Sequence, residues 1–121
     1  MNNQALSIRP FIGAKDYEIS RSFYKELGFE EIVLSKNLIL FKLDKLGFYL
    51  QDANVKEWID NTMIFLEVDN IDAHLEKITA LNLPIKYPGV RVSEIQQLHW
   101  GKEYFIHDPA GILWHIGTFN Y

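Results

Sequence analysis

The amino-acid sequence predicts an α+β domain that contains two βαβββ modules. The first observation is a repeated pair of helix signals: Asp16 and Gly28 bound one helix, and Asn70 and Asn82 bound another. Each signal of the second helix lies 54 residues after its counterpart in the first, as in an internal repeat. The second observation is a series of short apolar runs, separated by polar breaks, after the first helix. We expect one domain over residues 1–121, with module 1 at about 6–51 and module 2 at about 63–118.

Module 1 is expected to begin with a strand over residues 6–12, in which Pro10 suits a strand end or a sheet edge. A helix from about Tyr17 to Leu27 follows, because Asp16 can cap its start and Gly28 can adopt the left-handed conformation of a helix stop. Three short strands are then predicted at about residues 30–34, 38–43 and 46–51, separated by polar breaks at 35–37 and 44–45.

Module 2 repeats this order. Residues 63–68 predict a strand, and the helix after Asn70 carries an apolar stripe at positions 71, 75 and 78. The offset of 54 residues also relates Phe11 to Phe65 and Ile12 to Leu66. At the end of the chain, residues 100–117 predict a hairpin around the turn Asp108-Pro109-Ala110-Gly111.

Composition and charge exclude several classes of function. The chain is 48% hydrophobic and has a formal net charge of −4, so no basic surface is expected to hold a nucleic acid. It has no cysteine, which excludes disulfides, zinc-thiolate sites and thiol nucleophiles. No segment reaches the roughly 20 apolar residues of a membrane span, and no signal peptide is evident. We therefore expect a cytoplasmic protein with no membrane partner.

Three segments resemble the vicinal oxygen chelate superfamily of glyoxalases, bleomycin resistance proteins and ring-cleaving dioxygenases. They are IGAKDYEISRSFYKELGF, VDNIDAHLEKITALNL and WGKEYFIHDPAGILWHIG, and the bleomycin-resistance-like members are the most similar in pattern. The resemblance implies two βαβββ modules that form curved mixed sheets around a groove, in the glyoxalase/bleomycin resistance fold. It also implies a homodimer whose grooves draw on both modules. In metal-dependent members, the groove holds a divalent ion.

The metal-ligand positions that the resemblance implies fall on Arg9, Tyr49, Met63 and His115. A guanidinium group has no lone pair to donate, and divalent ions rarely choose a thioether. Only His115 is a good ligand, so we expect that the metal site is lost and that no cofactor is bound.

The alternation of side chains along strands predicts which residues face the groove. With a four-residue turn at 108–111, His107 would pair with Ile112, and Tyr104 would pair with His115 and share its face. Ile8, Ile12, Phe48, Leu50, Ile64, Leu66, Trp114 and Ile116 would lie on the core faces. The predicted ligand-binding residues are Arg9, Phe11, Tyr49, Gln51, Met63, Phe65, Glu67, Trp100, Tyr104 and His115.

Two functions remain open on this evidence. The first is a non-catalytic protein of the bleomycin-resistance type that sequesters an aromatic or cationic small molecule. The second is a lyase or isomerase in which His115 acts as acid or base and Arg9 holds an anionic substrate oxygen. A third interpretation is purely structural: His115 is a hydrogen-bonded residue within a crowded sheet.

Overall fold

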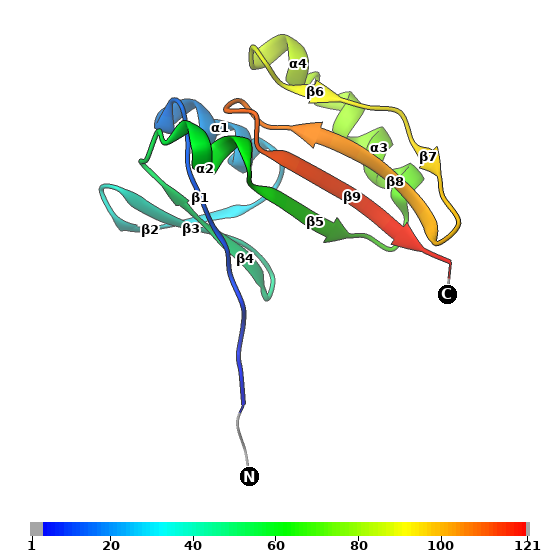
Figure 1. Cartoon of the computed structure of the whole chain (residues 1–121), viewed down its shortest axis with the longest axis horizontal. Coiled ribbons are helices and arrows are strands. Elements are labelled where there is room, and N and C mark those ends of the chain that lie inside the picture. Colours follow the sequence, from blue (N-terminus) through cyan, green and yellow to red (C-terminus); the bar gives the residue numbers. More distant parts are fainter. Residues whose placement is uncertain (1–3, 121) are drawn as a thin grey trace.

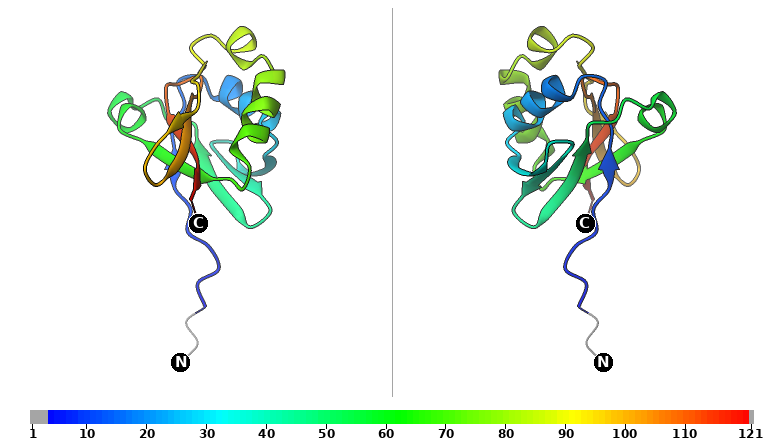
Figure 2. Two further views of the ribbon diagram at one scale, coloured as in Figure 1. Left: turned by 90° about the vertical axis from the view of Figure 1, so that its right-hand side faces the viewer. Right: turned by 90° about the vertical axis from the view of Figure 1, so that its left-hand side faces the viewer.

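The computed structural model describes residues 4–120, whose strands form two sheets (Figure 1). The first sheet has the strand order β1-β4-β3-β2, and the second has the order β5-β9-β8-β6, with β7 also paired to β8. The two sheets lie side by side in the view of Figure 1. Figure 2 shows that α1 and α3 lie on the same side of the strands.

Module 1 contains one helix and the first sheet. Its elements are β1 (Phe11–Ile12), α1 (Tyr17–Glu26), β2 (Glu30–Ser35), β3 (Leu38–Leu43) and β4 (Leu46–Gln51). The side chain of Asp16 accepts a 3.2 Å hydrogen bond from the Ile19 N–H, which satisfies one of the free donors at the start of α1. Gly28 has φ of 103°, as expected of the left-handed residue that ends a helix.

Module 2 follows the short connecting helix α2 (Lys56–Asp60). Its elements are β5 (Met63–Glu67), α3 (Ile71–Ala80), α4 (Leu83–Lys86), β6 (Arg91–Val92), β7 (Gln96–Gln97), β8 (Gly101–His107) and β9 (Leu113–Phe119). Asn70 caps α3 through a 3.0 Å hydrogen bond from the Ala73 N–H, and Asn82 follows with φ of 53°. Helix α3 therefore starts and ends 54 residues after α1, as the repeat predicts.

Strand register confirms the equivalence of the two modules. Phe11 of β1 lies beside Tyr49 of β4 in a parallel ladder, and Phe65 of β5 lies beside His115 of β9 in another. Because Phe11 and Phe65 are related by the repeat, Tyr49 and His115 occupy equivalent positions in the two sheets.

Two elements differ from the predictions. Only Phe11–Ile12 of the expected first strand is assigned to β1, and residues 4–8 extend away from the body of the molecule (Figure 1). Ile8 is consequently 96% exposed and does not belong to the core, contrary to prediction. The repeat would also place a strand near residue 84, but α4 lies there because Asn82 and Pro84 start a new helical turn.

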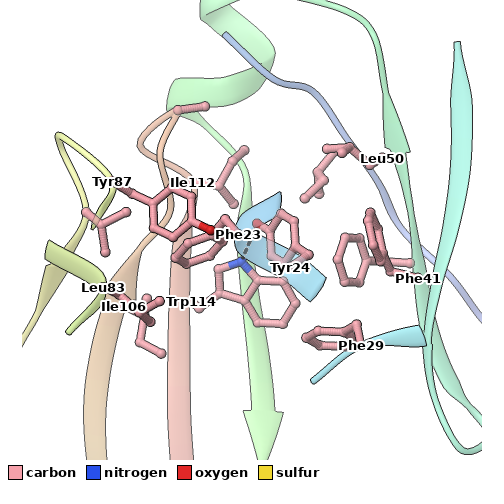
Figure 3. Close-up of a cluster of buried hydrophobic side chains, with 14 of the residues drawn as sticks. Phe23, Tyr24, Phe29, Phe41, Leu50, Leu83, Tyr87, Ile106, Ile112 and Trp114 are labelled. Atoms are coloured by element: carbon pink, nitrogen blue, oxygen red, sulfur yellow. Dashed lines mark hydrogen bonds between the residues drawn. The ribbon is translucent and has the colours of Figure 1, made fainter. Parts of the chain in front are cut away.

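The buried core draws on both modules (Figure 3). Tyr24 of α1 lies at its centre, where its hydroxyl donates to Asp108 Oδ2 at 2.6 Å and accepts from Trp114 Nε1 at 3.0 Å. Among the residues around this cluster are Phe23, Phe41, Phe48, Leu50, Ile106, Ile112 and Ile116, all at most 2% exposed. One face of each sheet is thus buried against the helices, and side chains on the opposite faces, such as Phe11 and Phe65, are partly exposed.

Within residues 4–120, no helix is long and apolar enough to cross a membrane.

Candidate ligand-binding site

The side chains on the face of the second sheet that points away from α3 form the candidate site, and we call this the outer face. Tyr104, Ile106, Trp114 and Ile116 are buried on the opposite face. Register and alternation therefore place the following residues on the outer face: Met63, Phe65, Glu67, Glu103, Phe105, His107, Leu113 and His115. The prediction that Met63, Phe65, Glu67 and His115 share one face agrees with this register.

Phe65 and Phe105 contact the His115 ring on the outer face, and Trp100 and Phe119 contact Phe65; we call these four aromatic residues the aromatic cluster. The Phe65 ring lies 6.0 Å from Trp100 and 5.8 Å from Phe119, measured between centroids. Phe105 meets the His115 ring edge-on at 5.1 Å, and Phe65 stacks beside it at 6.5 Å. Phe65 is still 44% exposed, so its ring presents an accessible apolar surface.

Gly117 makes room for this arrangement. It lies next to Glu67 on β5 and opposite Glu103 on β8. A Cβ atom at Gly117 would lie 2.5 Å from Cζ of Phe65, well inside van der Waals contact. The absence of a side chain therefore allows the Phe65 ring to lie over the sheet, next to His115.

His115 is paired with Glu103, a residue that the sequence analysis did not select. Nδ1 of His115 lies 2.6 Å from Oε1 of Glu103, and the two side chains are only 24% and 11% exposed. Because a carboxylate accepts hydrogen bonds and does not donate them, the pairing places the proton on Nδ1. In the neutral imidazole, Nε2 then carries a lone pair and can accept a hydrogen bond from a ligand.

Tyr104 does not belong to the site, which corrects the prediction. It lies opposite Ile116, is fully buried, and its hydroxyl is 2.5 Å from Nδ1 of His74 on α3. Burial raises the pKa of the Tyr104 hydroxyl well above its ordinary value. His74 is half-buried against it, and burial together with Lys77 lowers the pKa of this histidine.

The length of the final turn explains this error. Asp108 accepts hydrogen bonds from the N–H groups of Ala110, Gly111 and Ile112 at 2.9, 2.9 and 2.8 Å, so Ile112 is part of the loop. Strand pairing therefore resumes at His107 and Leu113. The extra residue shifts the register by one, and a shift of one residue exchanges the faces of a strand. His107 and Phe105 consequently share the face of His115, contrary to prediction.

Burial raises the pKa of the Asp108 carboxyl above its ordinary value, although hydrogen bonds from Tyr24 and the turn favour the ionised form. The partners of this carboxylate are the Tyr24 hydroxyl of α1 and the N–H groups of the turn. Asp108 therefore joins α1 to the hairpin, and its role is structural.

The remaining predicted residues lie on the first sheet. Arg9 Nη1 donates a 3.1 Å hydrogen bond to the Tyr49 hydroxyl, and Phe11 stacks on the Tyr49 ring at 4.6 Å. Gln51 lies opposite Leu38 on the same side of the sheet as Tyr49. The structure therefore gathers the predicted site residues into two groups: Arg9, Phe11, Tyr49 and Gln51 on the first sheet, and the His115 group on the second.

A cavity of about 820 Å³ opens between the segment before β1, the start of β4, and β5. Phe29, Phe48 and Trp114 of the core contribute to its walls, together with Phe65 and Glu67. It does not reach His115, Glu103, Arg9 or Tyr49. The cavity lining also includes the charged residues Lys45, Glu67 and Asp69. We place the candidate site at His115 and Glu103 because an imidazole and a carboxylate that are largely buried and paired with each other lie there beside apolar rings.

Metal ligands are not gathered at this site. Within residues 4–120, no three His, Cys, Asp or Glu side chains are grouped closely enough to hold a metal ion. Arg9 and Met63 also lie where the resemblance would place donors, and neither side chain suits a divalent ion. The absence of a metal cofactor stays a prediction.

The chain resembles known proteins in its structure but not in its sequence. No family model and no curated protein matches the chain. A bleomycin-binding protein from Streptomyces verticillus, solved with copper(II)-bleomycin, superposes with a TM-score of 0.79 at 21% identity, covering 95% of this chain and 97% of that one. Another bleomycin-binding protein, complexed with bleomycin, gives 0.78 at 16% identity over 93% and 97%. Lactoylglutathione lyase from Agrobacterium tumefaciens gives 0.71 at 19% identity over 93% and 92%. The chain therefore has the fold of the vicinal oxygen chelate superfamily, which confirms at the level of fold the resemblance seen in its sequence.

Proposed function

We propose that this protein binds an aromatic or cationic small molecule on the outer face of the second sheet and sequesters it unchanged. The observation that carries the proposal is the aromatic cluster around the His115–Glu103 pair. Aromatic rings supply apolar contact area, while the pair supplies hydrogen-bonding groups that orient a ligand. The bleomycin-binding proteins and TnmS3, an antibiotic binding protein, bind small molecules on the same fold and support this proposal by analogy.

We further propose that the chain, as a single domain, forms a homodimer in which the outer faces contribute to shared grooves. Both sheets present apolar side chains to solvent: Phe11 is 53% exposed on the first, and Met63 is 65% exposed on the second. Leu6 and Ile8, in the segment before β1, are 91% and 96% exposed. Apolar surface of this extent is covered in many proteins by a second subunit. A sedimentation profile of a 14.2 kDa monomer at tens of micromolar would contradict the dimer.

The alternative function is an enzyme of the lyase or isomerase type. The His115–Glu103 pair favours it, since a carboxylate that orients an imidazole is the usual arrangement of a general base. Arg9 was expected to hold an anionic substrate oxygen, but its Nη1 is hydrogen-bonded to Tyr49 on the other sheet. Ligand binding requires only side chains that already lie together on the second sheet, whereas the enzymatic function was expected to require Arg9 as well.

A screen of aromatic compounds followed by calorimetry tests the proposal. The wild-type protein is expected to bind at least one compound, and chromatography should recover that compound unchanged. Phe65→Ala should weaken binding at least tenfold, whereas Ile85→Ala should not, because Ile85 is 84% exposed on α4 and far from the cluster in the fold. Conversion of the compound by the wild type, lost in His115→Gln, would favour the enzyme.

A further inference from the structure

Glu103 is an unusual residue to find in the middle of the outer face. It lies in the middle of β8, and its side chain is only 11% exposed. Acidic side chains are rarely buried this far unless they are paired. Oε1 is paired with Nδ1 of His115, but no hydrogen bond from residues 4–120 reaches Oε2. Oε2 of Glu103 is therefore available to accept a hydrogen bond from a ligand.

The pair as a whole presents acceptors to a ligand. Oε2 of Glu103 is one acceptor, and Nε2 of His115 is another when the imidazole is neutral, since its Nδ1 then donates to Glu103. A ligand that satisfies both groups has to donate hydrogen bonds. A carboxylate forms stronger hydrogen bonds with charged donors than with neutral ones, so Glu103 favours a cationic donor over a neutral one.

The basic side chains near this sheet have other partners or positions. Lys102 extends from the opposite side of β8 and pairs with Asp72 on α3 at 3.4 Å. Arg9 is hydrogen-bonded to Tyr49 on the first sheet. Arg91 lies beside His107, at the other end of β8, where it contributes to lowering the pKa of that histidine after the larger effect of burial. None of these three residues neutralises Glu103 by direct contact.

The aromatic cluster also favours a cationic ligand over a neutral one. The faces of aromatic rings carry partial negative charge and attract cations, most strongly when solvent is excluded. Phe65 and Phe105 both lie within 6.5 Å of the His115 ring, measured between centroids. A planar cation that reaches the pair would therefore be flanked by ring surface.

We propose that Glu103 is the specificity-determining residue of the site and that it selects planar aromatic ligands bearing a cationic N–H donor, such as an amidinium or a protonated amine. This inference rests on the proposed binding function and narrows it to a ligand class. The donor reaches Oε2 of Glu103 and Nε2 of His115, and the attached ring lies against Phe65.

Three probes with the same ring system test this inference: 2-naphthamidine, which is cationic, 2-naphthamide, which is neutral, and 2-naphthoate, which is anionic. Their affinities are measured by NMR titration, following the indole N–H signal of Trp100. The wild type is expected to bind the amidine at least tenfold more tightly than the amide and to bind the naphthoate most weakly. Glu103→Gln should remove the preference for the amidine and leave the affinity for the amide within about twofold.

Glu57→Gln is the matched control, because it removes the same charge from the exposed surface of α2. It should keep the preference for the amidine. Equal affinity of the wild type for amidine and amide, or an unchanged preference in Glu103→Gln, would overturn the selectivity and leave the binding function standing. Failure of all three probes to bind would overturn the binding function with it. The affinities of the wild type for the amidine and the amide test the selectivity even if Glu103→Gln does not fold.

Discussion

The Tyr24 hydroxyl donates a 2.6 Å hydrogen bond to Oδ2 of Asp108, 84 residues further along the chain. This bond joins α1 of module 1 to the turn between β8 and β9 of module 2. The same hydroxyl accepts from Trp114 Nε1, so its removal would leave a buried donor and a buried acceptor without partners.

We therefore expect Tyr24→Phe to lower the free energy of unfolding by about 1–3 kcal/mol. Tyr17→Phe is the control, because the Tyr17 hydroxyl is buried with no hydrogen-bond partner among residues 4–120. That substitution should cost little or even stabilise the protein. Urea unfolding of both variants provides the measurement, and an equal loss in the two would contradict the assigned role of the Tyr24 hydroxyl.

Two glycines in β8 and β9 should respond very differently to alanine. A Cβ at Gly117 would meet the tip of the Phe65 side chain, which can rotate, whereas a Cβ at Gly101 would lie 1.9 Å from the backbone oxygen of Thr118. Gly101→Ala is therefore expected to destabilise the fold severely. Gly117→Ala should change thermal stability little but weaken ligand binding, because it displaces Phe65 from the aromatic cluster. Unchanged ligand affinity in Gly117→Ala would show that the position of Phe65 is unimportant.

The contribution of His74 to stability should fall as the pH decreases from about 7 to 5. Burial lowers the pKa of His74 below its ordinary value of 6.5, so the unfolded chain binds a proton more readily than the folded one in this range. The contribution of His74 is present above its unfolded pKa and is lost as the pH falls toward its folded pKa. His74→Gln should reduce the slope of unfolding free energy against pH by at most about 1.4 kcal/mol per pH unit. The slope is obtained by urea unfolding at several pH values, and an identical slope in the variant would contradict this assignment.

The register of the last hairpin predicts which of its aromatic residues meets a ligand. Phe105→Ala should weaken binding, because Phe105 contacts the His115 ring on the outer face. Tyr104→Phe should leave affinity unchanged, because Tyr104 is buried against His74 on the opposite face. Calorimetry with a ligand from the screen measures both, and the reverse result would mean that the faces are exchanged.

Local signals made much of the fold predictable. Asp16 and Asn70 act as caps through their own side chains, and Gly28 and Asn82 adopt positive φ, so these helix boundaries depend on nearby residues alone. The repeat of 54 residues then related the two modules without reference to tertiary structure.

The site was harder to predict because it depends on strand register. The Asp108 side chain accepts hydrogen bonds from three successive N–H groups of the turn, so Ile112 belongs to the loop. The alternation of apolar and polar residues in the sequence does not reveal this extra loop residue. Tyr104 was therefore placed on the wrong face, and Glu103 was missed. The signal that locates Glu103 is its position opposite Gly117 in the corrected register, two residues along β9 from His115.

The central claim is that the outer face around His115 and Glu103 is the ligand-binding site. Mapping of chemical shifts on the labelled protein during titration with 2-naphthamidine tests it most directly. We expect the largest changes at Phe65, Trp100, Glu103 and His115. Changes confined to the cavity between the segment before β1 and β4, at residues such as Leu6, Ile8 and Leu46, would contradict it.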